Sequence, residues 1–221
     1  MDVEGETGEA LLNMFLAHGA DATVADLEGS TPLHLFRATE HQIKSLRILI
    51  AAGADINAAR KTDGQTPLIT ASRQYQKTNP MLFQDYKAEI NQQDHLGNTA
   101  FHYACESWMM ESKDTDIWLS LVDPTICNNL GRPAAINMMW GSEGEGRVEA
   151  LRKMVGMGLP LESRDYLGRT LLLQYLGNPE NIYGVEHFIR MLLSLGADVK
   201  ATDYDGKSGK WKYTQPKQSN Y

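Results

Sequence analysis

Three short stretches contain residue types that could hold an ion or a phosphate. Gly206-Lys207-Ser208 resembles the end of a phosphate-binding loop, but Ala201 stands where that loop needs its first glycine. Asp203-Tyr204-Asp205-Gly206 resembles part of a calcium loop, but Lys212 stands where a bidentate glutamate is required. The glycine-rich stretch 141–146 carries glutamates that would repel phosphate. None of the three predicts a nucleotide or calcium site.

The histidines and cysteines lack the spacing of a metal site or a redox pair. The six histidines show no His-X-X-X-His pair, and Cys105 and Cys127 lie 22 residues apart. We therefore predict no catalytic residue, no cofactor and no metal, and we expect that the chain is not an enzyme.

Composition excludes several other functions. The 221 residues carry 21 basic and 28 acidic side chains, a formal charge of −7, so no general attraction to nucleic acid or anionic lipid is expected. Apolar runs such as Ile48–Ala54 are far shorter than the ~18 residues that cross a bilayer. Two cysteines are too few for a disulfide framework, and residues 1–8 lack the order of a secretory signal. We expect a cytoplasmic or nuclear protein that binds neither nucleic acid nor membrane.

The elements that position these residues come from an internal repeat. Glycines 29, 64, 97, 131, 168 and 206 follow one another at spacings of 35, 33, 34, 37 and 38 residues. Gly-Ala-Asp precedes three of them by about ten residues, at Gly19, Gly53 and Gly196. Two residues after the glycines comes a second signature, clearest in Thr31-Pro32-Leu33-His34 and Thr99-Ala100-Phe101-His102.

These signatures resemble the ankyrin-repeat family, over roughly Glu9 to Gly206. The resemblance implies an all-α ankyrin-repeat solenoid of helix-turn-helix units with β-hairpin fingers. The units predicted are a leader (1–8), a partial first repeat (9–28), repeats at 29–63 and 64–96, a divergent repeat at 97–130, repeats at 131–167 and 168–205, and an irregular tail at 206–221. The resemblance also implies that His34 and His102 bond the neighbouring turn and that Cys105 is a buried filler.

The residues of each unit favour the same fold. Thr31 before Pro32 predicts a first helix from position 31 to about 39, capped by the threonine hydroxyl. The second helix carries an apolar stripe, Leu11, Leu12, Phe15 and Leu16 in the first copy and Phe188, Ile189, Leu192 and Leu193 in the last. Such short helix pairs bury their stripes only by stacking on their neighbours. Asp-X-X-Gly turns between units predict the hairpin fingers.

The pattern departs from regularity at both ends and in the middle. The helix expected at Glu9–Ala17 lacks an N-terminal partner, so either the array is longer, which we favour, or something else covers this end. Asn79-Pro80 predicts a shortened helix in the third repeat. Trp108, Trp118 and Trp140 fall nearby, either to refill lost space or to form an aromatic binding surface. The tail is expected to be loosely docked, although its positive charge could mark a contact.

Ankyrin-like arrays imply a concave surface of fingers and first helices that holds another protein. We predict that this chain is a protein-binding scaffold, monomeric or part of a longer array. The predicted partner-binding residues are Leu27, Glu28, His95, Asn98, Asn129, Arg132, Tyr166, Arg169, Tyr204 and Asp205. Tyr166, Leu167 and Arg169 form the strongest predicted anchor. For Leu96, Leu130 and Leu167 the alternative is packing of finger against finger.

Two further hypotheses remain open. The array could be the targeting region of a larger enzyme or microbial effector whose activity lies outside this segment. The resemblance also implies a possible substrate role, since the family's hairpin asparagine is hydroxylated when a leucine lies eight residues before it. Leu49 and Asn57 have that spacing.

Overall fold

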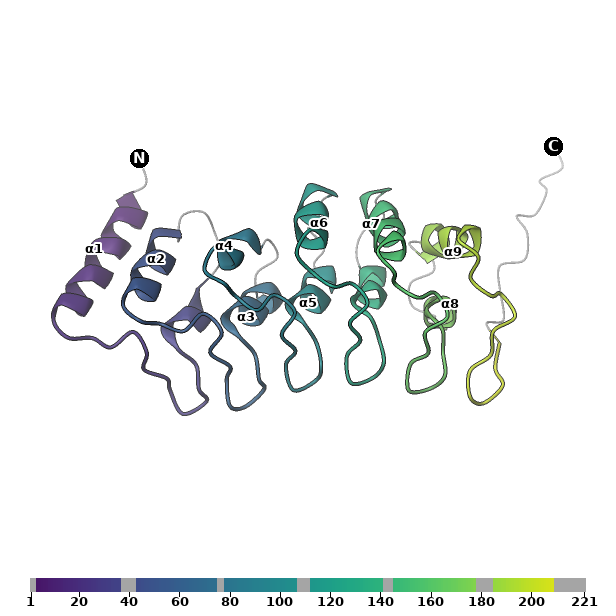
Figure 1. Cartoon of the computed structure of the whole chain (residues 1–221), viewed down its shortest axis with the longest axis horizontal. Helices are drawn as coiled ribbons and strands as arrows, with labels where there is room; N and C mark the ends of the chain where they lie inside the picture. Colours follow the sequence, from purple (N-terminus) through teal and green to yellow (C-terminus); the bar gives the residue numbers. More distant parts are fainter. Residues whose placement is uncertain are drawn as a thin grey trace, which may run out of the picture.

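The computed structural model describes residues 3–36, 43–74, 78–106, 112–140, 145–177 and 185–208. These residues form an elongated stack of helices with a hairpin finger projecting between consecutive units (Figure 1). The elements, with 3-10 helices marked η, are α1 (Val3–Ala17), η1 (Pro32–Leu35), α2 (Ile43–Ala51), α3 (Pro67–Gln74), α4 (Met81–Gln84), α5 (Ala100–Glu106), α6 (Ser112–Leu119), η3 (Ala134–Trp140), α7 (Glu145–Gly156), α8 (Leu171–Leu176) and α9 (Val185–Ser194).

The helices lie in two rows. The inner row, next to the fingers, is η1, α3, α5, η3 and α8, and each member contacts the next. The outer row is α1, α2, α4, α6, α7 and α9, with contacts between α1 and α2, α6 and α7, and α7 and α9. In the described part of the chain, β structure is limited to isolated bridges within the fingers. The predicted all-α solenoid is confirmed.

The apolar stripes of the second helices form the core between the rows. In α9, Phe188, Ile189 and Leu192 are 6%, 1% and 0% exposed, as the helical period predicts. The ring of Tyr175 from α8 stacks on Phe188, with centroids 5.5 Å apart. Burying side chains of this size stabilises a fold by roughly 1.5–3 kcal/mol each. The last repeat is therefore held by its own helix pair as well as by α7.

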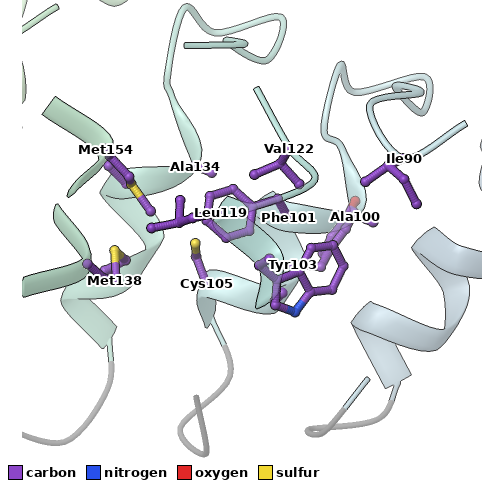
Figure 2. Close-up of a cluster of buried hydrophobic side chains, with 14 of the residues drawn as sticks. Ile90, Ala100, Phe101, Tyr103, Cys105, Leu119, Val122, Ala134, Met138 and Met154 are labelled. Atoms are coloured by element: carbon purple, nitrogen blue, oxygen red, sulfur yellow. The ribbon is translucent and has the colours of Figure 1, made fainter. Parts of the chain in front are cut away.

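The middle of the solenoid keeps a continuous core although its outer helices are short. α4 has four residues and follows Pro80, as predicted, and Phe83 from α4 is fully buried. Trp118 is also buried and lies against Phe101, with ring centroids 5.8 Å apart. Figure 2 shows Phe101 among side chains from neighbouring repeats. Trp118 thus fills space, while Trp108 and the side chain of Trp140 lie outside the described residues.

Two histidines bond one repeat to the next, which confirms their predicted structural role. His102 Nδ1 accepts from the backbone N–H of Thr99 at 3.1 Å, and its Nε2 donates to the Arg132 carbonyl at 3.1 Å. His34 makes the equivalent bonds to Thr31 and Gln65. Because Nδ1 accepts an amide proton, the rings are neutral. Burial lowers the pKa of both, which favours that neutral form.

The partner of the threonine hydroxyl at the start of an inner helix depends on whether a histidine lies three residues later. At Thr66 and Thr170 the hydroxyl accepts a backbone N–H from three residues ahead, as predicted. At Thr31 the hydroxyl instead contacts the His34 ring, and the helix expected to reach position 39 is a 3-10 turn over Pro32–Leu35. Phe36 is extended and packs edge-on against Phe83, so the turn ends there. Positions 37–42 lie outside the described residues.

The first helix is longer than predicted. α1 begins at Val3, inside the stretch expected to be a leader before Glu9. The sequence there contains Glu4 and Glu6, a residue type that the dipole of a helix favours in its first turns. The predicted burial of its apolar stripe is only partly correct, since Leu12 and Leu16 pack against the core but Leu11 and Phe15 are 49% and 52% exposed. Of the predicted tail, only residues up to Ser208 are described.

Candidate partner-binding surface

Except for the finger around Gly64, where Arg60 stands at the equivalent position, each finger is closed by one acidic or amide side chain. Asp94 Oδ1 accepts the backbone N–H groups of Leu96 and Asn98, both at 2.9 Å, and Gly97 takes a φ of 76°. The same pair of bonds to residues two and four positions ahead recurs at Asp26, Asn128, Asp165 and Asp203. The Asp-X-X-Gly spacing therefore predicted these turns correctly.

Backbone hydrogen bonds join consecutive fingers into a ladder. In each case the N–H of a tip residue donates to a carbonyl of the preceding finger. The pairs are Lys61 to Glu28 and His95 to Asp63 at 2.8 Å, and Asn129 to Leu96, Tyr166 to Leu130 and Tyr204 to Leu167 at 3.0 Å. The fingers are thus fixed relative to one another through main chain, which leaves their tip side chains free for other contacts.

Large apolar side chains stand at the tips of this ladder. Leu27 and Tyr204 are 99% and 72% exposed, and Leu96, Leu130 and Leu167 are 65%, 42% and 41% exposed. This exposure disfavours the alternative in which the leucines hold the fingers together, because the ladder already does so through backbone. Exposed apolar side chains gathered in a row are a feature of protein-binding surfaces.

The predicted anchor around Tyr166 divides into a free part and a fixed part. Tyr166 is 56% exposed, whereas the Arg169 guanidinium donates to Asp165 Oδ2 at 2.7 Å and 3.0 Å. Arg132 lies 3.6 Å from the same oxygen and 5.9 Å from the centroid of the Tyr166 ring. Burial acts to raise the pKa of Asp165, but the hydrogen bonds and charge of Arg169 outweigh it and hold that pKa below its usual value. Arg169 and Arg132 therefore support the finger, while Tyr166 is available.

The other predicted residues divide in the same way. Asn98 Oδ1 accepts from Asn128 at 2.9 Å, and Asn129 Nδ2 donates to the His95 carbonyl at 2.9 Å, so both asparagines bridge fingers. The side chains of Glu28, His95 and Asp205 are exposed, and Asp205 pairs with Lys207 at 2.9 Å.

The inner helices contribute side chains to this surface that the sequence prediction did not name. On the inner helices, the Tyr103 hydroxyl donates to Asp94 Oδ2 at 2.6 Å, and burial raises the pKa of Tyr103 to about 12. Arg73 lies 5.7 Å from the centroid of the Tyr103 ring. Glu106 is seven residues after Thr99, as Arg73 is after Thr66, so the repeat register contained the signal for this pair of opposite charges.

Asn57, the predicted hydroxylation site, ties two repeats together. Its Oδ1 accepts the backbone N–H of Glu89 at 2.8 Å, and its Nδ2 donates to the Lys87 carbonyl at 3.3 Å. Leu49 is buried. The modification stays a prediction.

The thiol of Cys105 and the candidate metal ligands can be checked among the described residues. Cys105 is buried among apolar side chains, and burial raises the pKa of its thiol, the opposite of what a nucleophile needs (Figure 2). Among the described residues, no cluster of three or more His, Cys, Asp or Glu side chains suits a metal ion. Within the same ranges, no helix is both long enough and apolar enough to span a membrane.

Known proteins resemble this chain in both sequence and fold. The family model for ankyrin repeats in three copies matches residues 5–94. Human ankyrin repeat and SOCS box protein 16 is 32% identical over 94 residues, covering 42% of this chain and 20% of that protein. The E3 ubiquitin-protein ligase KEG of Arabidopsis thaliana is 31% identical over 113 residues, covering 51% and 7%. The crystal structure of the ankyrin repeat domain of Bcl-3, of the IkappaB protein family, has a TM-score of 0.64 at 21% identity, covering 91% of this chain and 85% of that one.

These likenesses confirm the resemblance seen in the sequence. The solved structure extends it beyond residue 94, because its fold covers nearly the whole chain. The chain spans 20% or less of the length of the first curated relatives that it matches.

Proposed function

Because this chain is an ankyrin-repeat protein in fold and, over residues 5–94, in sequence, we propose that it binds another protein through the concave surface of its fingers and inner helices, without catalysis of its own. Ankyrin repeats are generally protein-interaction modules. The observation that carries the proposal is the row of exposed tip side chains on a ladder fixed by backbone hydrogen bonds.

The physical reason is that the tips are both apolar and held in place. Tyr166 and Tyr204 lie on adjacent fingers joined by the bond from Tyr204 N–H to the Leu167 carbonyl. Large aromatic side chains with few rotatable bonds lose little entropy on binding and are frequent at interface hot spots. Farther along the array, Arg73 on α3 and Glu106 on α5 add charged side chains to the inner-helix part of this surface.

The experiment compares capture by the wild-type chain with capture by the double variant Tyr166→Ala, Tyr204→Ala. Both side chains are exposed, so circular dichroism should show an unchanged fold. Met157→Ala is the matched control, because Met157 is 44% exposed and follows α7, away from the fingers. A partner identified by mass spectrometry is then titrated by calorimetry. We expect a loss of affinity of at least tenfold, about 1.4 kcal/mol, for the finger variant alone. Equal affinity for the wild type and the finger variant would refute the proposed surface.

A second candidate assigns this binding to a larger polypeptide, an enzyme or microbial effector that uses the array for targeting. The observation that favours it is the small share of its relatives that the chain covers, 7% in the E3 ligase. An immunoblot of native extract with an antibody against this chain gives the size of the polypeptide. A band near 24.7 kDa, the mass of the chain, would contradict this candidate.

We further propose that the binding takes place in the cytoplasm or nucleus. Cys105 and Cys127 are both free thiols, which fits a reducing compartment. Fluorescence microscopy of a tagged chain in the source cells tests this proposal.

A further inference from the structure

The outward side of α1 has the composition of a buried helix face but is open to solvent. Leu11, Met14 and Phe15 are 49%, 48% and 52% exposed. Counting back from Gly-Ala-Asp in the last repeat gives their equivalents. These are Phe188, Met191 and Leu192, which are 6%, 4% and 0% exposed. The first repeat therefore presents at its surface the side chains that other repeats bury.

The last repeat shows what such a face packs against. There the inner helix α8 lies against α9, and Tyr175 stacks on Phe188. α1 contacts α2 through its other side, where Leu12 and Leu16 are partly buried against the core. Within the described ranges, no inner helix precedes α1. An occupant of this face must supply an aromatic, partly apolar segment in the position that α8 has beside α9.

The ladder of backbone hydrogen bonds stops at the first and last described fingers. Among the described residues, the first finger has an unused donor and the last finger has an unused acceptor. The Leu27 N–H is equivalent to the N–H groups of Tyr166 and Tyr204, which donate to preceding fingers, but it has no such acceptor among the described residues. At the far end, the Asp205 carbonyl is equivalent to the Leu167 carbonyl and accepts no bond from a further finger in the same ranges. The first finger thus offers a backbone donor, and the last finger offers a backbone acceptor.

The sequences at the two ends are complementary in charge. Residues 1–18 contain Asp2, Glu4, Glu6 and Glu9 and no lysine or arginine. Glu9 pairs with Lys44 at 3.4 Å. The segment from 207 to 221 contains Lys207, Lys210, Lys212 and Lys217 and no acidic residue. It also contains Trp211 and Tyr213, directly after the last finger, where the other repeats have their inner helix.

We propose that copies of this chain associate head to tail, with the last finger and the 207–221 segment of one copy covering α1 and the first finger of the next. The first helix and the last finger lie at opposite ends of the solenoid (Figure 1), so the contact forms between copies. It continues the stacking that joins repeats within one chain, with Trp211 and Tyr213 against Leu11 and Phe15 and lysines beside glutamates. Because the contact joins two different surfaces, it extends into chains of copies. From the sequence we expect a chain that is monomeric or part of a longer array, and association between copies differs from both.

Sedimentation velocity of the purified full chain over a range of concentrations tests the proposal. We expect a weight-average mass that rises above 24.7 kDa with concentration and falls when salt is added. Phe15→Glu places a charge on the contact and should weaken association at least tenfold. Met157→Glu, at a similarly exposed apolar side chain away from both ends, should leave association unchanged.

A mixing experiment identifies which surfaces meet. The Phe15→Glu copy retains its tail surface, and a copy that ends at Ser208 retains its α1 surface but has lost Trp211, Tyr213 and three of the four tail lysines. Each alone should remain a monomer, and the mixture should form a heterodimer. Self-association of the copy ending at Ser208 would show pairing of α1 with α1 and overturn the proposal. A wild-type chain that remains monomeric at low salt up to high concentration would overturn it as well. Only this chain is present, so the outcome is independent of any partner of the fingers.

Discussion

Replacing Gly97 by alanine tests whether the ladder holds the fingers in place. Gly97 has a φ of 76°, and a Cβ there would lie 2.5 Å from the backbone nitrogen of Asn129. That nitrogen makes the ladder bond to the Leu96 carbonyl at 3.0 Å. The new methyl group must therefore displace the next finger and break its bond.

The magnitude follows from three contributions. An L-residue in the left-handed region costs about 1–2 kcal/mol, and the loss of a backbone hydrogen bond costs about 0.5–1.5 kcal/mol. Reduced entropy of the unfolded chain returns about 0.4–1 kcal/mol. We expect Gly97→Ala to lower the free energy of unfolding by about 2 kcal/mol. Gly196→Ala is the matched control, because Gly196 has a φ of 96° but nothing within 4 Å of the added Cβ, and it should cost about 1 kcal/mol or less.

Urea denaturation followed by circular dichroism measures both variants, and hydrogen exchange at the Asn129 amide reports the ladder bond directly. Protection of that amide should fall in Gly97→Ala and not in Gly196→Ala. Equal losses of stability in the two variants, with Asn129 still protected, would show that close approach of the fingers contributes nothing and would refute the ladder as the source of their rigidity.

Three other predictions concern Arg169, Lys87 and His102. Arg169→Ala removes two hydrogen bonds from the buried carboxylate of Asp165 and should cost roughly 1–3 kcal/mol in thermal unfolding, whereas Tyr166→Ala should stay within about 0.5 kcal/mol; equal shifts would contradict the division between support and tip. Lys87 has a φ of 62° at a position where other repeats have glycine. Lys87→Gly should therefore stabilise the folded chain by about 0.5–1 kcal/mol, whereas Lys87→Ala should not. Melting temperatures of the two variants test this. The folded pKa of His102 lies below the unfolded value near 6.5, so the unfolded chain binds more protons and this histidine's contribution to stability is full above pH 6.5 and declines as pH falls below it. His102→Ile, which copies Ile69 of the neighbouring repeat, should flatten the fall in urea midpoint between pH 7.5 and 5.5, and an unchanged slope would rule out His102 as its cause.

The sequence was sufficient for the repeat, the finger turns and the facing of the second helices, because each depends on local chemistry. Asp94 and Gly97 specify a turn by themselves, and the spacing of Phe188 and Leu192 specifies a buried stripe. Because these signals recur at equivalent positions along the chain, a repeat with a degenerate sequence can still be assigned from its neighbours.

Features that depend on the geometry between residues could not be predicted in the same way. Arg169 looked like a free anchor, although Asp165 four residues earlier was visible in the sequence as a possible partner. Only the folded finger brings the two side chains together and leaves Tyr166 exposed. The short η1 also depends on packing between repeats, since Phe36 turns away from the helix to meet Phe83.

The four-residue α4 has a mechanical consequence for the whole array. Its neighbours in the outer row, α2 and α6, have nine and eight residues, so the third repeat has the shortest support on that side. In a solenoid each unit contacts only its neighbours, and tension applied to the two ends passes through every unit in series. The array should therefore deform most easily at the third repeat when tension is applied to its ends. Under load, curvature should change first around Phe83, altering the spacing between fingers on either side while each finger keeps its own shape.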